Sequence, residues 1–246
     1  NQHAYASRIA RIQRITSAKF MLTSDELIDR YQAHFPHVQL LSLSEVDAKN
    51  EVGDLPQTHP GDTALVQFTS GSTAAPKGVS LAHRQLVANA QAISLAIDVD
   101  AKRDRGVSWL PMHHDMGLIG FLLTPVLAQV SNWYLPPAEF ARRPQRWLDL
   151  MHETQASISV APNFGYELVT RRLRKADIKK WDLSHWRAAG CGGEPILPNV
   201  LEKFARLLAP SGFNKSAFVP SYGLAEATLA VAMSPLSRGM VTRELN

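Results

Sequence analysis

Ten consecutive residues, from Thr69 to Gly78, combine four hydroxyl side chains, two glycines and one lysine. They follow an apolar run at 64–68 and precede a stretch with helical periodicity. Glycine lets backbone N–H groups converge on an anion, hydroxyls add neutral donors, and the ammonium group of Lys77 offsets negative charge. The segment is not a Walker loop, which needs Ser or Thr directly after its lysine. Its composition indicates either a polyphosphate-binding loop or a polar surface turn.

A second polar group, formed by His113, His114 and Asp115, could serve as metal ligands or as an acid–base pair. Metal ligation needs further ligands, and the neighbouring sequence supplies no cluster of Glu or His. The uncharged run 116–126 that follows could form a wall for an alkyl chain. A simpler interpretation is a buried helix with Asp115 near its N-terminus. The last two interpretations are compatible.

The elements that position these segments alternate between strands and helices. Short β-rich apolar runs are followed by longer runs with helical periodicity. Such alternation implies crossover connections, so we expect an α/β fold in which a mostly parallel sheet is flanked by helices. Strands are expected at about 19–22, 38–41, 64–68, 107–110, 132–135, 158–160 and 217–219, and helices at about 24–33, 83–97, 138–155, 163–175 and 197–208.

Residues 48–62 are rich in Pro and Gly and poor in apolar side chains, as linkers are. The sequence therefore predicts three parts. An N-terminal α/β segment covers residues 1–47, a linker covers 48–62, and a core that carries the polar motifs covers 63–246.

Composition narrows the class of protein. The chain has 246 residues, 45% hydrophobic and 20% charged, so extensive disorder is excluded. A net charge of +4 is too small to require a nucleic-acid partner. The basic run 171–180 is interpreted as a solvated helix face, and the alternative is that it attracts an acidic carrier protein. The single cysteine, Cys191, is expected in a buried structural strand and indicates a cytoplasmic environment. Prolines interrupt the uncharged stretch 116–138, which predicts a buried helix and a buried strand rather than a membrane span.

Four segments resemble, in order and spacing, the signature motifs of the adenylate-forming enzymes, the superfamily of acyl-CoA synthetases, luciferases and peptide-synthetase adenylation domains. They are residues 69–78, 110–118, 192–195 and 222–228. The residues of these segments are most similar to those of the fatty acyl-AMP ligases. One example is Ala225, where many members of the superfamily have Thr. The resemblance covers residues 67–228 and implies a truncated part of the large N-terminal domain, with the small C-terminal domain absent.

The resemblance also implies a role for each candidate residue. The catalytic set is Lys77, Thr73 and Glu226, with Glu226 as the ligand of Mg²⁺. The expected ATP contacts are Thr69, Ser70, Gly71, Ser72, Thr73, Lys77, Gly78, Gly193, Glu194, Pro195, Tyr222 and Gly223. The expected contacts of the acyl substrate are His114, Asp115, Met116, Gly117, Asn163 and Phe164. Aromatic residues at helical spacing such as Phe164 are, however, more often core.

The function implied is activation of a fatty acid by ATP to acyl-AMP and pyrophosphate, with Mg²⁺ as cofactor. The acyl group then passes to the phosphopantetheine thiol of an acyl carrier protein. One alternative is an acyl-CoA synthetase. Another is a non-catalytic binding module, because the expected catalytic lysine of the small domain is missing, and the isolated piece is expected to be weakly active or inactive.

Overall fold

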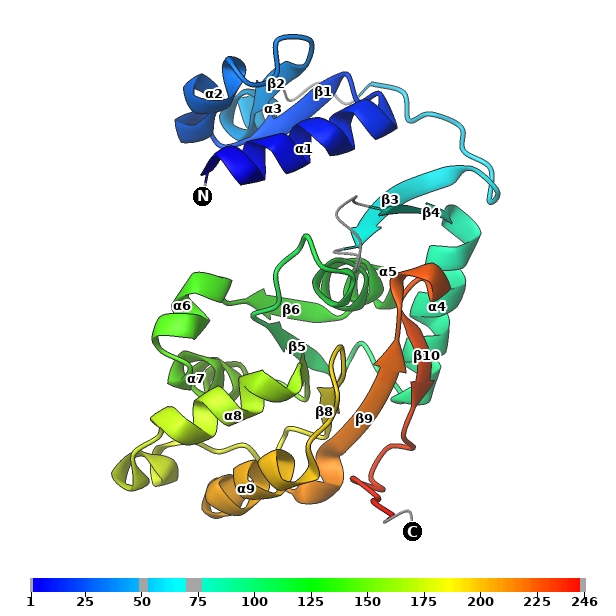
Figure 1. The fold of residues 1–246 in the computed structure, drawn as a ribbon. Coiled ribbons are helices and arrows are strands. Elements are labelled where there is room, and N and C mark those ends of the chain that lie inside the picture. Colours follow the sequence, from blue (N-terminus) through cyan, green and yellow to red (C-terminus); the bar gives the residue numbers. More distant parts are fainter. Residues whose placement is uncertain (1, 49–52, 70–76, 244–246) are drawn as a thin grey trace. The chain divides into compact units, whose positions relative to one another are not determined.

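The structure is a computed structural model that describes residues 2–48, 53–69 and 77–243 (Figure 1). It divides into two compact units. Unit 1 comprises Asn1–Asp62 and Phe68–Val79, and unit 2 comprises Thr63–Gln67 and Ser80–Asn246. Each unit is described by itself.

Unit 1 contains a parallel pair of strands. β1 (Phe20–Thr23) pairs with β2 (Gln39–Ser42), and α2 (Asp25–Gln32) is the crossover between them. Ser24 precedes the first turn of α2, and its side chain makes no capping hydrogen bond. The first turn instead carries Asp25 and Glu26, which are favourable at the positive end of a helix dipole.

Two further helices of unit 1, α1 (Gln2–Thr16) and α3 (Leu43–Ala48), were not expected from the sequence. Residues 53–62 contain neither helix nor strand. The boundaries predicted for the linker and its neighbours remain a prediction. After residue 62, β3 (Thr63–Thr69) and β4 (Lys77–Ala82) form a separate two-stranded sheet.

Unit 2 is built on a six-stranded sheet with strand order β10-β9-β8-β7-β5-β6. Neighbouring strands run parallel except β10, which is antiparallel to β9. The strands are β5 (Arg105–Ser108), β6 (Ser131–Tyr134), β7 (Ile158–Ala161), β8 (Ala188–Cys191), β9 (Phe218–Gly223) and β10 (Ala230–Met233). The mostly parallel α/β fold predicted from the sequence is confirmed.

Helices cover both faces of this sheet (Figure 1). One face is covered by α7 (Gln145–Thr154), α8 (Asn163–Arg172) and α9 (Pro198–Leu208), preceded by the short α6 (Pro137–Arg142). The other face is covered by α4 (His83–Ala96), the π-helix η1 (Met116–Leu123) and α5 (Thr124–Ala128). Short 3₁₀ turns complete the connections at Lys175–Lys180, Ala209–Ser211, Lys215–Ala217 and Ala225–Ala227.

The core lies on the face covered by α7, α8 and α9. Trp147 of α7 is fully buried, and its indole N–H donates to Ser159 Oγ of β7 at 2.9 Å. Around it the rings of Tyr166, Trp186 and Phe204 pack at tilted or edge-to-face angles with centroids 5.0–6.4 Å apart. Aromatic pairs favour such geometry because ring edges are positive and ring faces negative.

Two predictions for this unit differ from the structure. The strand expected to be buried at 132–135 is β6, at the sheet edge, where Trp133 is 37% and Tyr134 44% exposed. The helix expected at 163–175 is α8, which begins at Asn163 after Pro162 but ends at Arg172. The stretch 116–138 forms η1, α5 and β6, and no helix within the described residues is long and apolar enough to cross a membrane.

Candidate active site

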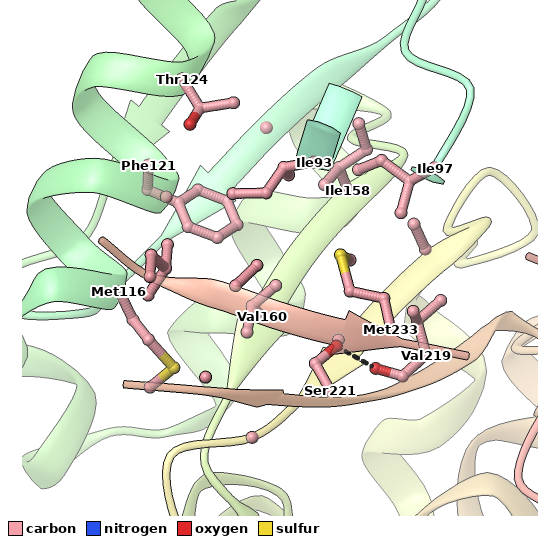
Figure 2. Close-up of a pocket in the computed structure, with 18 of the residues that line it drawn as sticks. Ile93, Ile97, Met116, Phe121, Thr124, Ile158, Val160, Val219, Ser221 and Met233 are labelled. Carbon is pink, nitrogen blue, oxygen red and sulfur yellow. Dashed lines mark hydrogen bonds between the residues drawn. The ribbon is translucent and has the colours of Figure 1, made fainter. Parts of the chain in front are cut away.

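A cavity of about 300 Å³ lies in unit 2, between the sheet and the helices α4, η1 and α5 (Figure 2). Its apolar lining comes from every element around it: Ile93, Ile97, Val99, Met116, Phe121, Pro125, Ala128, Val130, Ile158, Val160, Ala188, Val219, Leu229, Ala230 and Met233. The volume and the predominance of hydrocarbon are typical of a site for an organic ligand.

The cavity exists because the middle of this sheet face carries small residues. Gly106, Ala188 and Gly190 all line it, and the strand registers place them on one face with Ile158 and Val160. A Cβ atom at Gly190 would lie 2.4 Å from Val160 Cγ2. Larger side chains at these positions would therefore fill the cavity or displace its walls.

Most of the polar lining gathers at one end of the cavity. Ser221 and Tyr222 lie near the carboxyl end of β9, and Gly192 and Gly193 follow the carboxyl end of β8. From there the cavity extends to Ala188 at the start of β8, a strand whose four residues span about 10 Å at roughly 3.3 Å per residue. Ligands of parallel α/β sheets bind beyond the carboxyl ends of the strands, so the polar end is where reactive groups are expected.

Met116 and Gly193 meet at this polar end. Gly193 has φ = +82°, a conformation that favours glycine, and a Cβ there would lie 2.9 Å from Met116 Cε. The missing side chain leaves the backbone of residue 193 accessible beside the thioether. This geometry leaves room for a ligand to approach the backbone closely, as the role of Gly193 implied by the resemblance requires.

His114 and Asp115 form an ion pair at the same end, with Nδ1 and Oδ1 2.6 Å apart. The hydrogen bond to Asp115 raises the pKa of His114 above its usual value, against the effect of burial. Burial favours neutral Asp115, but the hydrogen bonds from His114 and from the Met116 backbone N–H outweigh it and lower the pKa of the carboxyl group. The hydrogen bond between the two side chains thus favours the charged form of each at this end of the cavity.

Three other predicted acyl contacts lie outside the cavity lining. Gly117 packs against the Pro111 carbonyl oxygen, 2.2 Å from where its Cβ would be. Phe164 is 49% exposed and packs edge-on against Trp109, with centroids 5.7 Å apart. Asn163 is buried, and its Oδ1 accepts a hydrogen bond from the Leu197 N–H at 3.0 Å.

Glu194 makes a contact that complements the one from Asn163. Its Oε1 accepts a hydrogen bond from the Phe164 N–H at 2.7 Å, at the start of α8. The loop after β8 and the N-terminus of α8 are thus held together by two side chains, one from each. Glu194 and Pro195 are exposed and do not line the cavity, so they are placed to position the Gly192–Gly193 turn.

Tyr222 and Gly223 line the polar end, and Glu226 follows them in the 3₁₀ turn Ala225–Ala227. Tyr222 is 63% exposed, so its ring is available to a planar ligand. Glu226 is exposed, and within the described residues no three His, Cys, Asp or Glu side chains converge as a metal cluster. A lone carboxylate fits Mg²⁺, which is commonly held by one or two carboxylates together with phosphate oxygens.

The predicted phosphate loop is described only at its ends. Thr69 ends β3, and Lys77 and Gly78 begin β4, in the part of the chain that belongs to unit 1. Lys77 and Gly78 are exposed. Ser70, Gly71, Ser72 and Thr73 lie outside the described residues.

The remaining candidates have structural environments. Cys191 is buried in β8, as predicted, and burial followed by the charge of Glu194 raises the pKa of its thiol to about 12. Such a thiol is not a nucleophile at neutral pH. In the basic run, α8 ends at Arg172 and Ile178 is buried while Lys179 and Lys180 are exposed, in agreement with a solvated basic surface.

Sequence reasoning did not identify the cavity floor. Gly106, Ala188 and Gly190 belong to three separate segments, and none stands in a motif that carries chemistry. The only signal was small residues at alternate positions within strands, as in Ala188 and Gly190. That pattern is weak because glycine inside a strand usually indicates a bulge or a close backbone approach.

Comparison with known proteins agrees with this geometry. A family model described as AMP-binding enzyme matches residues 1–244. A structure from work on fatty acyl-adenylate ligases of E. coli and L. pneumophila is 42% identical, with a TM-score of 0.87 over 94% of this chain and 44% of that chain. A fatty acyl-adenylate ligase from L. pneumophila, in complex with acyl adenylate and pyrophosphate, is 33% identical, with a TM-score of 0.89 over 94% of this chain and 41% of that chain.

Two curated relatives extend the comparison. The 4-hydroxyphenylalkanoate adenylyltransferase of Mycobacterium marinum is 36% identical over 94% of this chain and 39% of its own length. The medium-chain-fatty-acid–(acyl-carrier-protein) ligase TtuA of Teredinibacter turnerae is 37% identical over 72% of this chain and 27% of its own length. The chain thus spans less than half the length of the proteins it matches.

Proposed function

The chain belongs to the AMP-binding enzyme family, and we propose that the protein of which it is part activates fatty acids with ATP, releasing pyrophosphate and forming the acyl adenylate. The acyl group then passes to the phosphopantetheine thiol of an acyl carrier protein. The family match supports adenylate formation. A fatty acid as the substrate and a carrier protein as the acceptor are finer assignments than the family match supports.

The apolar cavity is the main support for a fatty acid as the substrate. A chamber lined mainly by hydrocarbon, with its charged side chains His114 and Asp115 at one end, is complementary to an alkyl chain with a terminal carboxylate. Burying each methylene stabilises the complex by ~0.8 kcal/mol, or about fourfold in affinity. His114 at the polar end would attract the carboxylate when its imidazole is protonated, a form that the hydrogen bond to Asp115 favours.

The reaction needs positioning and charge stabilisation rather than a protein nucleophile. A carboxylate oxygen attacks the α-phosphorus in line, while the bond from that phosphorus to the bridging oxygen breaks and pyrophosphate leaves. Donors of the 69–78 loop, with Lys77, would stabilise the departing phosphates. Tyr222 would stack on adenine beside Gly193, and Glu226 would hold Mg²⁺, which would supply charge neutralisation on the phosphate oxygens.

The names of similar proteins also support a fatty acid substrate and a carrier-protein acceptor. One solved neighbour is named as a complex with acyl adenylate and pyrophosphate, the two products proposed here. One relative is named as a ligase of medium-chain fatty acid and acyl carrier protein. The relative that acts on 4-hydroxyphenylalkanoates provides the competing substrate class, an aryl-tipped acid.

Pyrophosphate release by the full-length protein tests the proposal. Release should require a fatty acid, and Lys77→Ala and Glu226→Ala should each lower kcat/KM by about a hundredfold or more, as loss of a preorganised charged group does. Lys203→Ala and Glu202→Ala, two exposed positions on α9, are the matched controls and should keep parental rates. Parental turnover in both site variants would refute the assigned roles.

The identity of the acyl acceptor and the identity of the acid substrate are tested in separate experiments. Thioester formation should be faster with a phosphopantetheinylated carrier protein than with coenzyme A, and the reverse order would identify an acyl-CoA synthetase. Saturated fatty acids should be preferred over 4-hydroxyphenylalkanoates of equal length. Preference for the aryl-tipped acids would move the assignment to that substrate class.

A further inference from the structure

The wall of the cavity formed by η1 has an unusual backbone junction. At its end the Thr124 N–H donates to the Ile119 carbonyl oxygen, five residues earlier, and Thr124 Oγ1 donates to the same oxygen at 2.7 Å. Pro125 has no N–H, so the carbonyl of Phe121 cannot receive the i→i+4 hydrogen bond of an α-helix. π-Helical turns of this kind are rare and often lie at functional sites.

Two side chains of β6 bond to that carbonyl instead. Asn132 Nδ2 donates to the Phe121 oxygen at 2.6 Å, and the Tyr134 hydroxyl donates to the same oxygen at 2.7 Å. The side chain of Phe121 is 5% exposed and points into the cavity from η1 (Figure 2). The two donors therefore hold the backbone of a residue whose ring is part of the cavity wall.

The sheet register explains why β6 can reach this carbonyl. Asn132 and Tyr134 alternate with Trp133, and they pair with Gly106 and Ser108 on the face that carries the cavity. A Cβ atom at Gly106 would lie 2.2 Å from Asn132 Oδ1. Gly106 thus provides room for the amide of Asn132 as well as for the cavity.

The same amide is only half satisfied. Asn132 Oδ1 is buried and has no hydrogen-bond partner within the described residues. A buried acceptor without a partner lowers stability, so the amide is poorly explained as a means of stabilising the fold. The contact that explains the position of Asn132 is the hydrogen bond from its Nδ2 to the Phe121 carbonyl oxygen.

We propose that Asn132 and Tyr134 are positioning residues for acyl selection: by holding the Phe121 carbonyl they fix the ring of Phe121, and the fixed ring limits the length of chain that the cavity accepts. The inference rests on the proposed function. If two hydrogen bonds hold the wall in place, an acyl chain that is too long clashes with it and is rejected. If the wall can move away, acids of different length are discriminated less.

The test measures kcat/KM for pyrophosphate release by the full-length protein across saturated fatty acids that differ by two methylenes. The variants are Tyr134→Phe, Asn132→Ser and the double variant. In the double variant, the preference for the best acid over the next longer one should fall by about fifteenfold, the value of two methylenes, and each single variant should show less. The KM for ATP should stay parental.

Trp133→Phe is the matched control, because it changes an aromatic residue of the same strand on the opposite face. Phe121→Leu should shift the profile toward longer acids directly. If the double variant does not fold, Tyr134→Phe is decisive alone, since it removes one hydroxyl and keeps the ring. An unchanged length profile in a folded variant overturns the inference. A parent that releases no pyrophosphate with any fatty acid refutes the proposed function, and this inference falls with it.

Discussion

The two faces of the six-stranded sheet in unit 2 are made by alternate residues of the same strands, yet they are covered in opposite ways. On one face Trp147, Tyr166 and Phe204 fill the space under α7, α8 and α9. On the other face Gly106 and Gly190 leave a cavity under α4, η1 and α5.

The helices over the cavity are held by hydrogen bonds at its margins instead of by packing at its centre. Arg187 Nη1 donates to the Ile97 carbonyl at the end of α4 at 2.7 Å. Asn89 of α4 exchanges two hydrogen bonds with the backbone of Ala230 in β10, at 2.9 and 3.1 Å. An open ligand site removes the packing that normally fixes a layer, and directional polar contacts replace it.

The largest effect is expected on the packed face. Phe204→Ala removes a fully buried ring that contacts five other aromatic residues, and it should lower the free energy of unfolding by about 3–5 kcal/mol. Urea unfolding followed by tryptophan fluorescence measures the loss. Leu95→Ala, at a position 82% exposed, is the control and should change stability by less than about 0.5 kcal/mol.

Two adjacent alanines of β8 allow a sharper comparison. Ala189 faces the packed core and Ala188 lines the cavity. Ala189→Leu should lower the free energy of unfolding by about 1–3 kcal/mol through overpacking. Ala188→Leu has room for its side chain, so its stability should stay near the parental value while activity with the longest acids is lost. Equal destabilisation by both variants would mean that the faces do not differ in packing.

The hydrogen bonds at the cavity margin should have a smaller effect. Asn89→Ala leaves the N–H and carbonyl of Ala230 without their partner on α4 and should cost about 1–2 kcal/mol. Because α4 lines the cavity, the KM for the fatty acid should rise as well. A variant with parental stability and parental KM would show that this contact does not hold the helix.

The smallest effect concerns the carboxylate that anchors Arg187. Burial favours neutral Asp104, but hydrogen bonds from Arg187, Asp100 and Ser157 outweigh it and lower its pKa to about 2. A lowered pKa gives stability that is present above the unfolded value near 4 and is lost as pH falls toward 2.

Asp104→Asn should therefore lose roughly 1 kcal/mol at neutral pH, because the neutral amide keeps one oxygen that can accept a hydrogen bond, and its unfolding should be less sensitive to acid between pH 4 and 2. Unfolding curves at several pH values for parent and variant measure this. An identical acid dependence in the two proteins would exclude Asp104 as the source.

Several features of the site could be predicted because they depend on residues close together in the sequence. Helical periodicity predicted a helix at 83–97, and α4 covers His83–Ala96. The helix expected at 138–155 is present as two helices, α6 and α7, divided at Pro144. The order of the four motifs was enough to predict the family, which the match over residues 1–244 confirms.

Other features were missed because local pattern does not contain them. A buried strand was expected at Cys191, but β8 reads Ala-Ala-Gly-Cys and has no β-branched or large aromatic residue, so propensity did not indicate that this strand lies at the centre of the sheet. Glu194 and Asn163 have residue types suited to ligand contact, but each bonds to a backbone N–H of the other's segment. Only the three-dimensional arrangement reveals which partner such a side chain meets.

The sequence by itself determined the alternation of strands and helices and the chemistry of its polar motifs, because periodicity and residue type act over a few neighbouring positions. The tertiary structure alone decided that Gly106, Ala188 and Gly190 form one floor, since strand register brings together residues more than 80 positions apart. It also decided that the Phe121 carbonyl meets Asn132 and Tyr134. A cavity is the space that side chains leave empty, and that space is defined only when distant segments pack around it.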